Sequence, residues 1–117
     1  MVAFDGSTTT RKGVEWVAAS ALFKGLEFHI VMDGPDNPAS REQLALAQAV
    51  LEGGGLSATA SLIEGEADKV LPAYAASQQI DLIVMGAYGH SRIRQLLVGS
   101  TTTAIIRTSP IAVLLLR

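Results

Sequence analysis

Two unbroken apolar runs constrain the fold of this chain most. They are IDLIVMG, from Ile80 to Gly86, and IAVLLLR, from Ile111 to Arg117. A strand with one solvated face alternates apolar and polar residues, whereas a strand covered on both faces stays apolar along its length. The two runs therefore predict a sheet with helices on both faces, and sheets of that kind are mostly parallel.

Three further strands are predicted from shorter apolar runs that end at turn residues. They cover Val2 to Phe4, Leu26 to Met32 and Ser57 to Ile63. Asp5-Gly6-Ser7 follows the first of these runs, and a turn-rich stretch from Asp33 to Pro38 follows the second. Such clusters are typical of the point where a strand ends and a helix begins.

Segments with the period of a helix separate these strands. The predicted buried face of the first helix consists of Val14, Val17, Ala18, Ala21 and Leu22. Ser40, with Gln43 three residues later, is predicted to cap the second helix. The buried face of that second helix is predicted to be Leu44, Ala47 and Leu51.

The last two helices complete a regular alternation of strands and helices. One opens at Gly65-Glu66-Ala67 and is expected to continue despite Pro72, and the other covers Ser100 to Arg107. The order βαβαβαβαβ predicts an α/β fold, a three-layer α/β/α arrangement around a five-stranded, mostly parallel sheet. Residues 1–117 are assigned to one domain, because a chain of 117 residues is too short for two ordinary cores.

Composition excludes several classes of function. A net charge of −2 gives no basic field for neutralising nucleic-acid phosphates, so no nucleic-acid partner is predicted. The absence of cysteine removes disulfides, thiolate nucleophiles and sulfur metal ligands. No apolar run approaches the roughly 18 residues that span a bilayer, and MVAFDGS lacks the features of a signal peptide. The prediction is therefore a cytoplasmic protein without a membrane partner.

A glycine-rich stretch between the two apolar runs suggests an anion site. Gly86, Gly89 and Gly99 follow a strand, and Ser100 comes where a helix begins. Glycines let main-chain amides approach an anion closely, and the first N–H groups of a helix have no partner within the helix. Two separate donor sites favour a polyphosphate over a single anion. The alternative is that the three glycines are turn and capping residues, which is the preferred explanation for Gly86 alone but not for the spaced set. In such sheets the ligand lies outside the carboxyl ends of the strands.

The chain resembles the ATP-binding universal stress proteins at this stretch. That family carries Gly, two residues, Gly, nine residues, and then Gly with Ser or Thr, and Gly86, Gly89, Gly99 and Ser100 match every fixed position. VAFDGS and SPIAVLLLR resemble the first and last strands of the family, and IDLIVMGAYGHSR is similar to its strand and loop before the phosphates. The resemblance extends over nearly the whole chain.

The resemblance implies a sheet order of 3-2-1-4-5, as in adenine nucleotide alpha hydrolase-like folds, and ATP as the cofactor, with or without Mg²⁺. It implies that Asp5 contacts the ribose or adenine, that Val31 contacts adenine through its backbone, and that Ala3 and Met85 line the same pocket. The implied phosphate-binding residues are Gly86, Gly89, Gly99, Ser100, Thr101 and Thr102.

Several polar residues outside this motif have two interpretations. His90 is either a solvated side chain or a charge-assisted partner of phosphate, and Asp5 is either a ligand contact or a helix cap. Asp33 is either a ribose-binding acid, as after the second strand of dinucleotide folds, or a turn residue. The turn is preferred, because Gly34-Pro35 follows it and the first strand has no GxGxxG. His29 is assigned a structural role, since a lone histidine cannot hold a metal, and no metal site is predicted.

The resemblance also implies pairing through the last strand, Ile111 to Leu116, either with a second copy or within a tandem protein. A bare apolar edge strand invites pairing in any case. Only MVAF precedes Asp5, which is shorter than the usual first strand of the family, and MGAYGHSR resembles tandem stress proteins. Two interpretations stay open, a chain start introduced at Met1 or one half of a tandem protein.

No catalytic residue is predicted. The sequence has no P-loop lysine and no HExxH, so any ATP hydrolysis is expected to be slow. The favoured function is an ATP-binding regulatory module of the stress response. The alternatives are a nucleotide-free dimerisation module and a weak ATP hydrolase.

Overall fold

The computed structural model describes residues 1–87 and 100–117. Strands and helices alternate along the chain, with one short 3-10 helix, η1. In chain order the elements are β1 (Val2–Ala3), α1 (Thr8–Ala19), η1 (Ala21–Phe23), β2 (Glu27–Asp33), α2 (Pro38–Gly53), β3 (Ser57–Ile63), α3 (Ala67–Ser77), β4 (Leu82–Gly86), α4 (Ser100–Thr108) and β5 (Ala112–Leu116).

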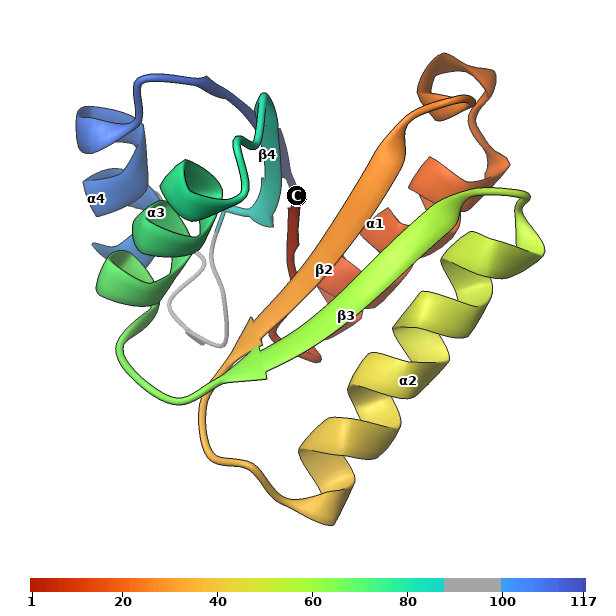
Figure 1. Cartoon of the computed structure of the whole chain (residues 1–117), viewed down its shortest axis with the longest axis horizontal. Coiled ribbons are helices and arrows are strands. Elements are labelled where there is room, and N and C mark those ends of the chain that lie inside the picture. The colour runs from red at the N-terminus through yellow and green to blue at the C-terminus, as the bar shows by residue number, and fades with distance from the viewer. Residues whose placement is uncertain (88–99) are drawn as a thin grey trace.

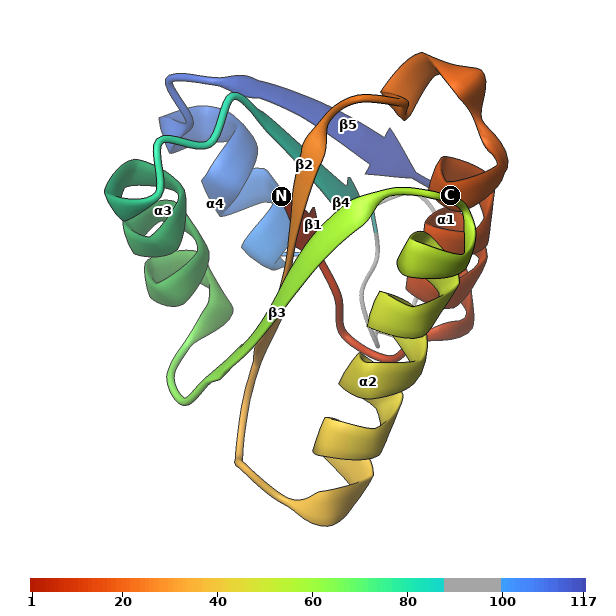
Figure 2. The same cartoon turned by 45° about the vertical axis from the view of Figure 1, so that its right-hand side comes forward.

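The strands form one five-stranded sheet in the order β3-β2-β1-β4-β5, and every neighbouring pair is parallel. Helices α1 and α2 cover one face of this sheet, and α3 and α4 cover the other (Figure 1). The same three layers are visible when the molecule is turned (Figure 2). The predicted α/β/α architecture and strand order are thus confirmed. Among the described residues, no helix is long and apolar enough to cross a membrane.

The sheet separates two apolar cores, which explains why its central strands are apolar without alternation. Val2 and Val84 pack in the core beneath α1 and α2. Ala3, Ile83 and Met85 point the other way and pack beneath α3 and α4. Successive side chains of a strand face opposite sides, so a strand buried on both faces needs an apolar residue at every position.

The first helix is shorter than its apolar pattern predicts. Helix α1 ends at Ala19, and the Ser20 hydroxyl accepts a hydrogen bond from the Leu22 N–H, which starts η1 instead. Leu22 is 80% exposed, so its predicted place on the buried face was wrong. Phe23 is buried in its place and packs edge to face against Trp16 and Phe28.

Two other predicted boundaries were also wrong. Helix α2 begins at Pro38, and the Asn37 side chain accepts a hydrogen bond from the Ser40 N–H at 2.8 Å, so Asn37 is the cap and Ser40 lies inside the helix. Strand β1 ends at Ala3 rather than Phe4, although the Phe4 N–H still donates to the Val31 carbonyl at 2.9 Å. A proline at the first helical position is compatible with the helix, because it has no N–H to leave unpaired.

Helix α3 continues past Pro72 and ends in a Schellman motif. The Ile80 N–H donates to the Ala75 carbonyl at 2.9 Å, and the Gln79 N–H donates to the Ala76 carbonyl. Gln79 takes the left-handed position of this motif with φ 54°, and it is the only non-glycine with positive φ in the described part of the chain. A side chain is disfavoured there, because its Cβ crowds the following carbonyl.

Replacing Gln79 by glycine should therefore stabilise the fold. We expect Gln79→Gly to raise the free energy of unfolding by about 1 kcal/mol. The left-handed strain that it relieves is larger in free energy than the entropic cost of the more flexible unfolded chain. Urea denaturation followed by circular dichroism measures this change. Gln78→Gly is the matched control, because Gln78 has φ −101° and should gain nothing. Equal effects at both positions would contradict the assignment.

Candidate functional site

A cavity of about 180 Å³ opens at the carboxyl edge of the sheet. It lies where β1, β2 and β4 end and where α1, α3 and α4 begin. Its lining includes six residues that the sequence assigns to the site: Ala3, Asp5, Met85, Gly86, Thr101 and Thr102. These residues are separated by up to 99 positions in the chain and come together only because the strands are parallel.

The remaining site residues have different placements. Ser100 lies beside Thr101 on a shelf that adjoins the cavity. Val31 is fully buried in the core beneath α3 and α4, and it does not line the cavity. Gly89, His90 and Gly99 lie outside the described residues.

The Asp5 carboxylate is held in a fixed orientation at the floor of the cavity. Its Oδ1 accepts hydrogen bonds from the Ser7 N–H at 2.9 Å and from the Thr10 hydroxyl at 2.7 Å. The cap of α1 is Ser7, whose hydroxyl accepts from the Thr10 N–H, so Asp5 is not the helix cap. A carboxylate oriented in this way can accept hydrogen bonds from hydroxyl or amine groups of a ligand.

The sequence analysis missed Thr10, which lines the cavity and is almost completely buried. Its hydroxyl orients Asp5, and a buried hydroxyl is stable only when it is hydrogen-bonded. The available signal was a polar residue on the buried side of an amphipathic helix, five positions after Asp5. The spacing shows that Asp5 and Thr10 are near each other in the chain, but it does not show that their side chains are hydrogen-bonded.

Thr102 connects α4 to β4. Its hydroxyl donates to the Gly86 carbonyl at 2.8 Å, and Thr102 itself is buried. This bond joins the first turn of α4 to the end of β4, and so it fixes where the positive end of the helix dipole lies. Ser100 is exposed and Thr101 is half-buried, so these two residues are better placed than Thr102 to meet an incoming group.

The described atoms around Gly86 do not require a glycine at this position. Its φ is not positive. A Cβ at this position would lie 3.5 Å from the Thr10 methyl and 3.9 Å from the Thr9 methyl, which are ordinary contact distances. A missing side chain at Gly86 is therefore explained neither by backbone strain nor by crowding from these neighbours.

The shelf beside the cavity is open and acidic. It has a volume of about 470 Å³ and is lined by Asp33, Glu66 and Asp68 together with Ser100 and Thr101. Asp33 and Thr101 also line the inner cavity, so the two spaces adjoin. Residues 1–87 and 100–117 contain no group of three His, Cys, Asp or Glu side chains that could hold a metal ion.

Asp33 contributes more to this site than its assigned turn role suggested. The turn is present, because Gly34 has φ 133° and its N–H donates to the Ile63 carbonyl at 3.0 Å. The Asp33 side chain nevertheless lines both the cavity and the shelf. Asp33 is therefore both the residue that begins the turn and a residue that lines the site.

A five-stranded parallel sheet of this order, with helices on both faces and a cavity at its carboxyl edge, is an α/β/α domain with the adenine nucleotide alpha hydrolase-like fold. The model of the universal stress protein family matches residues 32–117, and the chain belongs to that family. The resemblance noted in the sequence is thus confirmed.

Individual relatives agree with this assignment. The chain is 40% identical over 119 residues to universal stress protein Slr1230 of Synechocystis sp., a match that covers all of this chain and 42% of that protein. A universal stress protein solved in complex with cAMP is 25% identical, with a TM-score of 0.80 over 97% of this chain and 91% of that one. The Archaeoglobus fulgidus universal stress protein in complex with dAMP is 19% identical, with a TM-score of 0.76 over 99% and 94%.

The hydrogen bond between Thr102 and Gly86 should stabilise the fold measurably. Thr102→Val keeps the shape of the side chain but leaves the buried Gly86 carbonyl without this donor, so we expect a loss of about 1–3 kcal/mol in the free energy of unfolding. Thr108→Val is the control, because its exposed hydroxyl donates to the Ala104 carbonyl within the same helix. Its loss should stay within about 0.5 kcal/mol in urea denaturation. Equal losses would show that the Thr102 bond is not a structural tie.

Proposed function

We propose that this domain binds an adenine nucleotide, with ATP as the cofactor, and acts as a regulatory module of the stress response. The convergence of Asp5, Met85, Gly86 and Thr101 on one cavity at the carboxyl edge of the sheet carries the proposal. The binding of cAMP and dAMP by two structural relatives supports the choice of adenine.

The lining of the cavity suggests how the nucleotide is oriented. Ala3, Leu71 and Met85 offer apolar surface to the flat base. Asp5 accepts a hydrogen bond from a ribose hydroxyl, and its own hydrogen bonds to Ser7 and Thr10 hold it ready to do so. A binding group that is fixed in advance loses less conformational entropy when the ligand arrives.

The phosphate tail then leaves the cavity towards the shelf. The first turn of α4, at Ser100 and Thr101, offers N–H groups and the positive end of the helix dipole. A bare backbone at Gly86 allows the ligand to approach the strand end closely. Both features agree with the spaced glycine and hydroxyl pattern of the sequence.

The acidic side chains of the shelf make the charge of the ligand important. A free triphosphate would be repelled by Asp33, Glu66 and Asp68. A Mg²⁺ ion bound to the phosphates would offset that repulsion. We therefore expect Mg²⁺ to strengthen the binding of ATP much more than the binding of AMP or cAMP.

Binding and switching describe this site better than catalysis. Phosphoryl transfer needs a group that orients the attacking water as well as a clamp on the phosphates. The carboxylate of Asp5 is held by Ser7 and Thr10 and is assigned to the ribose. It is therefore not the group that would orient a water molecule at the phosphates. Nucleotide occupancy would instead shift the balance between conformations of the domain, by as much as its affinities for them differ.

Thermal denaturation with a panel of nucleotides tests this function. ATP with Mg²⁺, ADP, AMP and cAMP should raise the melting temperature, since a ligand at a hundred times its Kd adds about 2.7 kcal/mol of stability. GTP should not raise it. An unchanged melting temperature with every adenine nucleotide would contradict the proposal and favour a nucleotide-free module. Phosphate release above a no-protein control would favour the weak hydrolase.

One pair of variants locates the binding in the cavity. In Asp5→Asn the amide oxygen can still accept from Ser7 and Thr10, so the fold is kept while the charge is lost. We expect a roughly tenfold weaker affinity for ATP, the cost of one charged hydrogen bond. Asp81→Asn is the matched control, because Asp81 lies at the opposite edge of the sheet and should leave the affinity unchanged.

We also propose that the domain pairs through β5, with a second copy or within a longer protein. Among residues 1–87 and 100–117, strand β5 pairs with β4 and with no other strand, and its side chains from Val113 to Leu116 are only half-buried. An edge of this kind is stabilised when a second strand covers it. Sedimentation should find a species of twice 12.3 kDa at micromolar concentration, and a monomer at every concentration would contradict self-pairing.

A further inference from the structure

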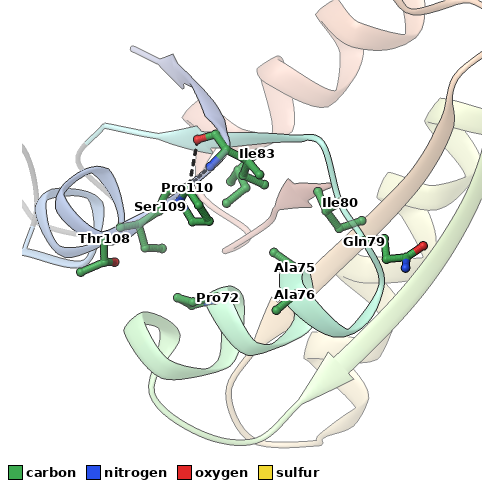
Figure 3. A pocket seen from close by; sticks show the side chains of 11 residues that line it. Pro72, Ala75, Ala76, Gln79, Ile80, Ile83, Thr108, Ser109 and Pro110 are labelled. Atoms are coloured by element: carbon green, nitrogen blue, oxygen red, sulfur yellow. Dashed lines mark hydrogen bonds between the residues drawn. The ribbon is translucent and has the colours of Figure 1, made fainter.

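A second cavity lies at the opposite edge of the sheet from the nucleotide site. It is a solvent-open cavity bounded by α3, α4, the amino end of β4 and the residues just before β5, and its volume is about 210 Å³ (Figure 3). Pro72 and Ala75 of α3 lie across from Ile83 of β4 and Pro110. None of the described residues that line it also lines the cavity that contains Asp5.

The walls of this second cavity present hydrocarbon. Thr108 and Ser109 line it, but their hydroxyls are bonded to the backbone: Thr108 donates to Ala104 at 2.8 Å, and Ser109 donates to the Ile111 carbonyl at 2.9 Å. No charged residue is among the described residues that line it. Its inner wall is formed by Ile83 and Ile105, which are 2% and 1% exposed.

The strained Gln79 lies at the rim of this cavity. Its amide points away from the other labelled side chains, so only the aliphatic part of the side chain contributes to the rim (Figure 3). The left-handed backbone of Gln79 is accounted for by the Schellman motif that ends α3.

We infer that this second cavity binds a small, uncharged, apolar molecule, of the size of one aromatic ring with a short alkyl group. An apolar cavity of about 150 Å³ can accept benzene. The present cavity is somewhat larger, and it is walled mainly by Ile, Ala and Pro side chains. A charged ligand would lose its hydration without finding a partner on these walls. The binding does not depend on the nucleotide site.

Toluene and methyl-labelled isoleucine test the inference. Four isoleucines line the cavity, namely Ile80, Ile83, Ile105 and Ile111, whereas Ile30 and Ile63 lie elsewhere. In an NMR titration, toluene should shift the four lining methyl groups along one saturable curve and leave Ile30 and Ile63 unchanged. No saturable shift, or equal shifts at all six isoleucines, would overturn the inference.

A matched pair of variants on α3 confirms where toluene binds. Ala76 and Ala73 are both exposed alanines of this helix, and only Ala76 lines the cavity. Ala76→Phe should fill the space and weaken toluene binding at least tenfold, while Ala73→Phe should change the Kd less than twofold. Equal binding in both variants would overturn the inference. Shifts of the four methyl groups on dilution of the protein alone would also overturn it, since they would show that a second copy occupies the cavity.

Discussion

The parallel order of the five strands is the constraint on which the site depends. It brings the carboxyl ends of β1, β2 and β4 to one edge of the sheet, together with the amino ends of the helices that follow them. Asp5, Asp33 and Gly86 are far apart in the sequence and meet at this edge for that reason alone. The bond from Thr102 to Gly86 then fixes α4 against the end of β4.

The two edges of the sheet have different chemistry. The carboxyl edge combines carboxylates, hydroxyls and helix amino ends around a partly apolar cavity, which suits a molecule with a flat base, a sugar and an anionic tail. The amino edge has a cavity walled by hydrocarbon. Helices α3 and α4 contribute to both cavities, through Leu71 and Thr102 at one end and through Ala75 and Ile105 at the other.

Most of the fold could be predicted from the sequence, because a central strand that is buried on both faces has a continuous run of apolar residues. The apolar run at β4 is an example, and it correctly predicted a sheet with helices on both faces. Helix ends were less certain, since they depend on single local hydrogen bonds. The hydrogen bond from the Leu22 N–H to the Ser20 hydroxyl begins η1 just after the end of α1. The Asn37 side chain, rather than Ser40, caps α2.

The lining of the candidate site could be predicted in part from motif spacing and from position after a strand, and much less where a residue's role depends on a distance to another side chain. Gly86 was assigned to the site from the spacing of the three glycines and the hydroxyl residue, and Asp5 from its place after the first strand, and both line the cavity. Thr10 was missed because only its 2.7 Å bond to Asp5 distinguishes it from any other threonine in a helix. Val31 is predicted to contact adenine through its backbone, and the position of its side chain in the core does not test that contact.

The most direct test of the account is an amide-resolved NMR titration of the domain with ATP and Mg²⁺. The account predicts that the amide signals of Asp5, Ala67, Thr101 and Thr102 shift together along one binding curve, because these residues lie at the carboxyl edge. The signals of Asp81, at the opposite edge, should stay unchanged. Shifts centred on the amino edge, or no shifts at millimolar ATP, would contradict the assignment of the nucleotide to this cavity.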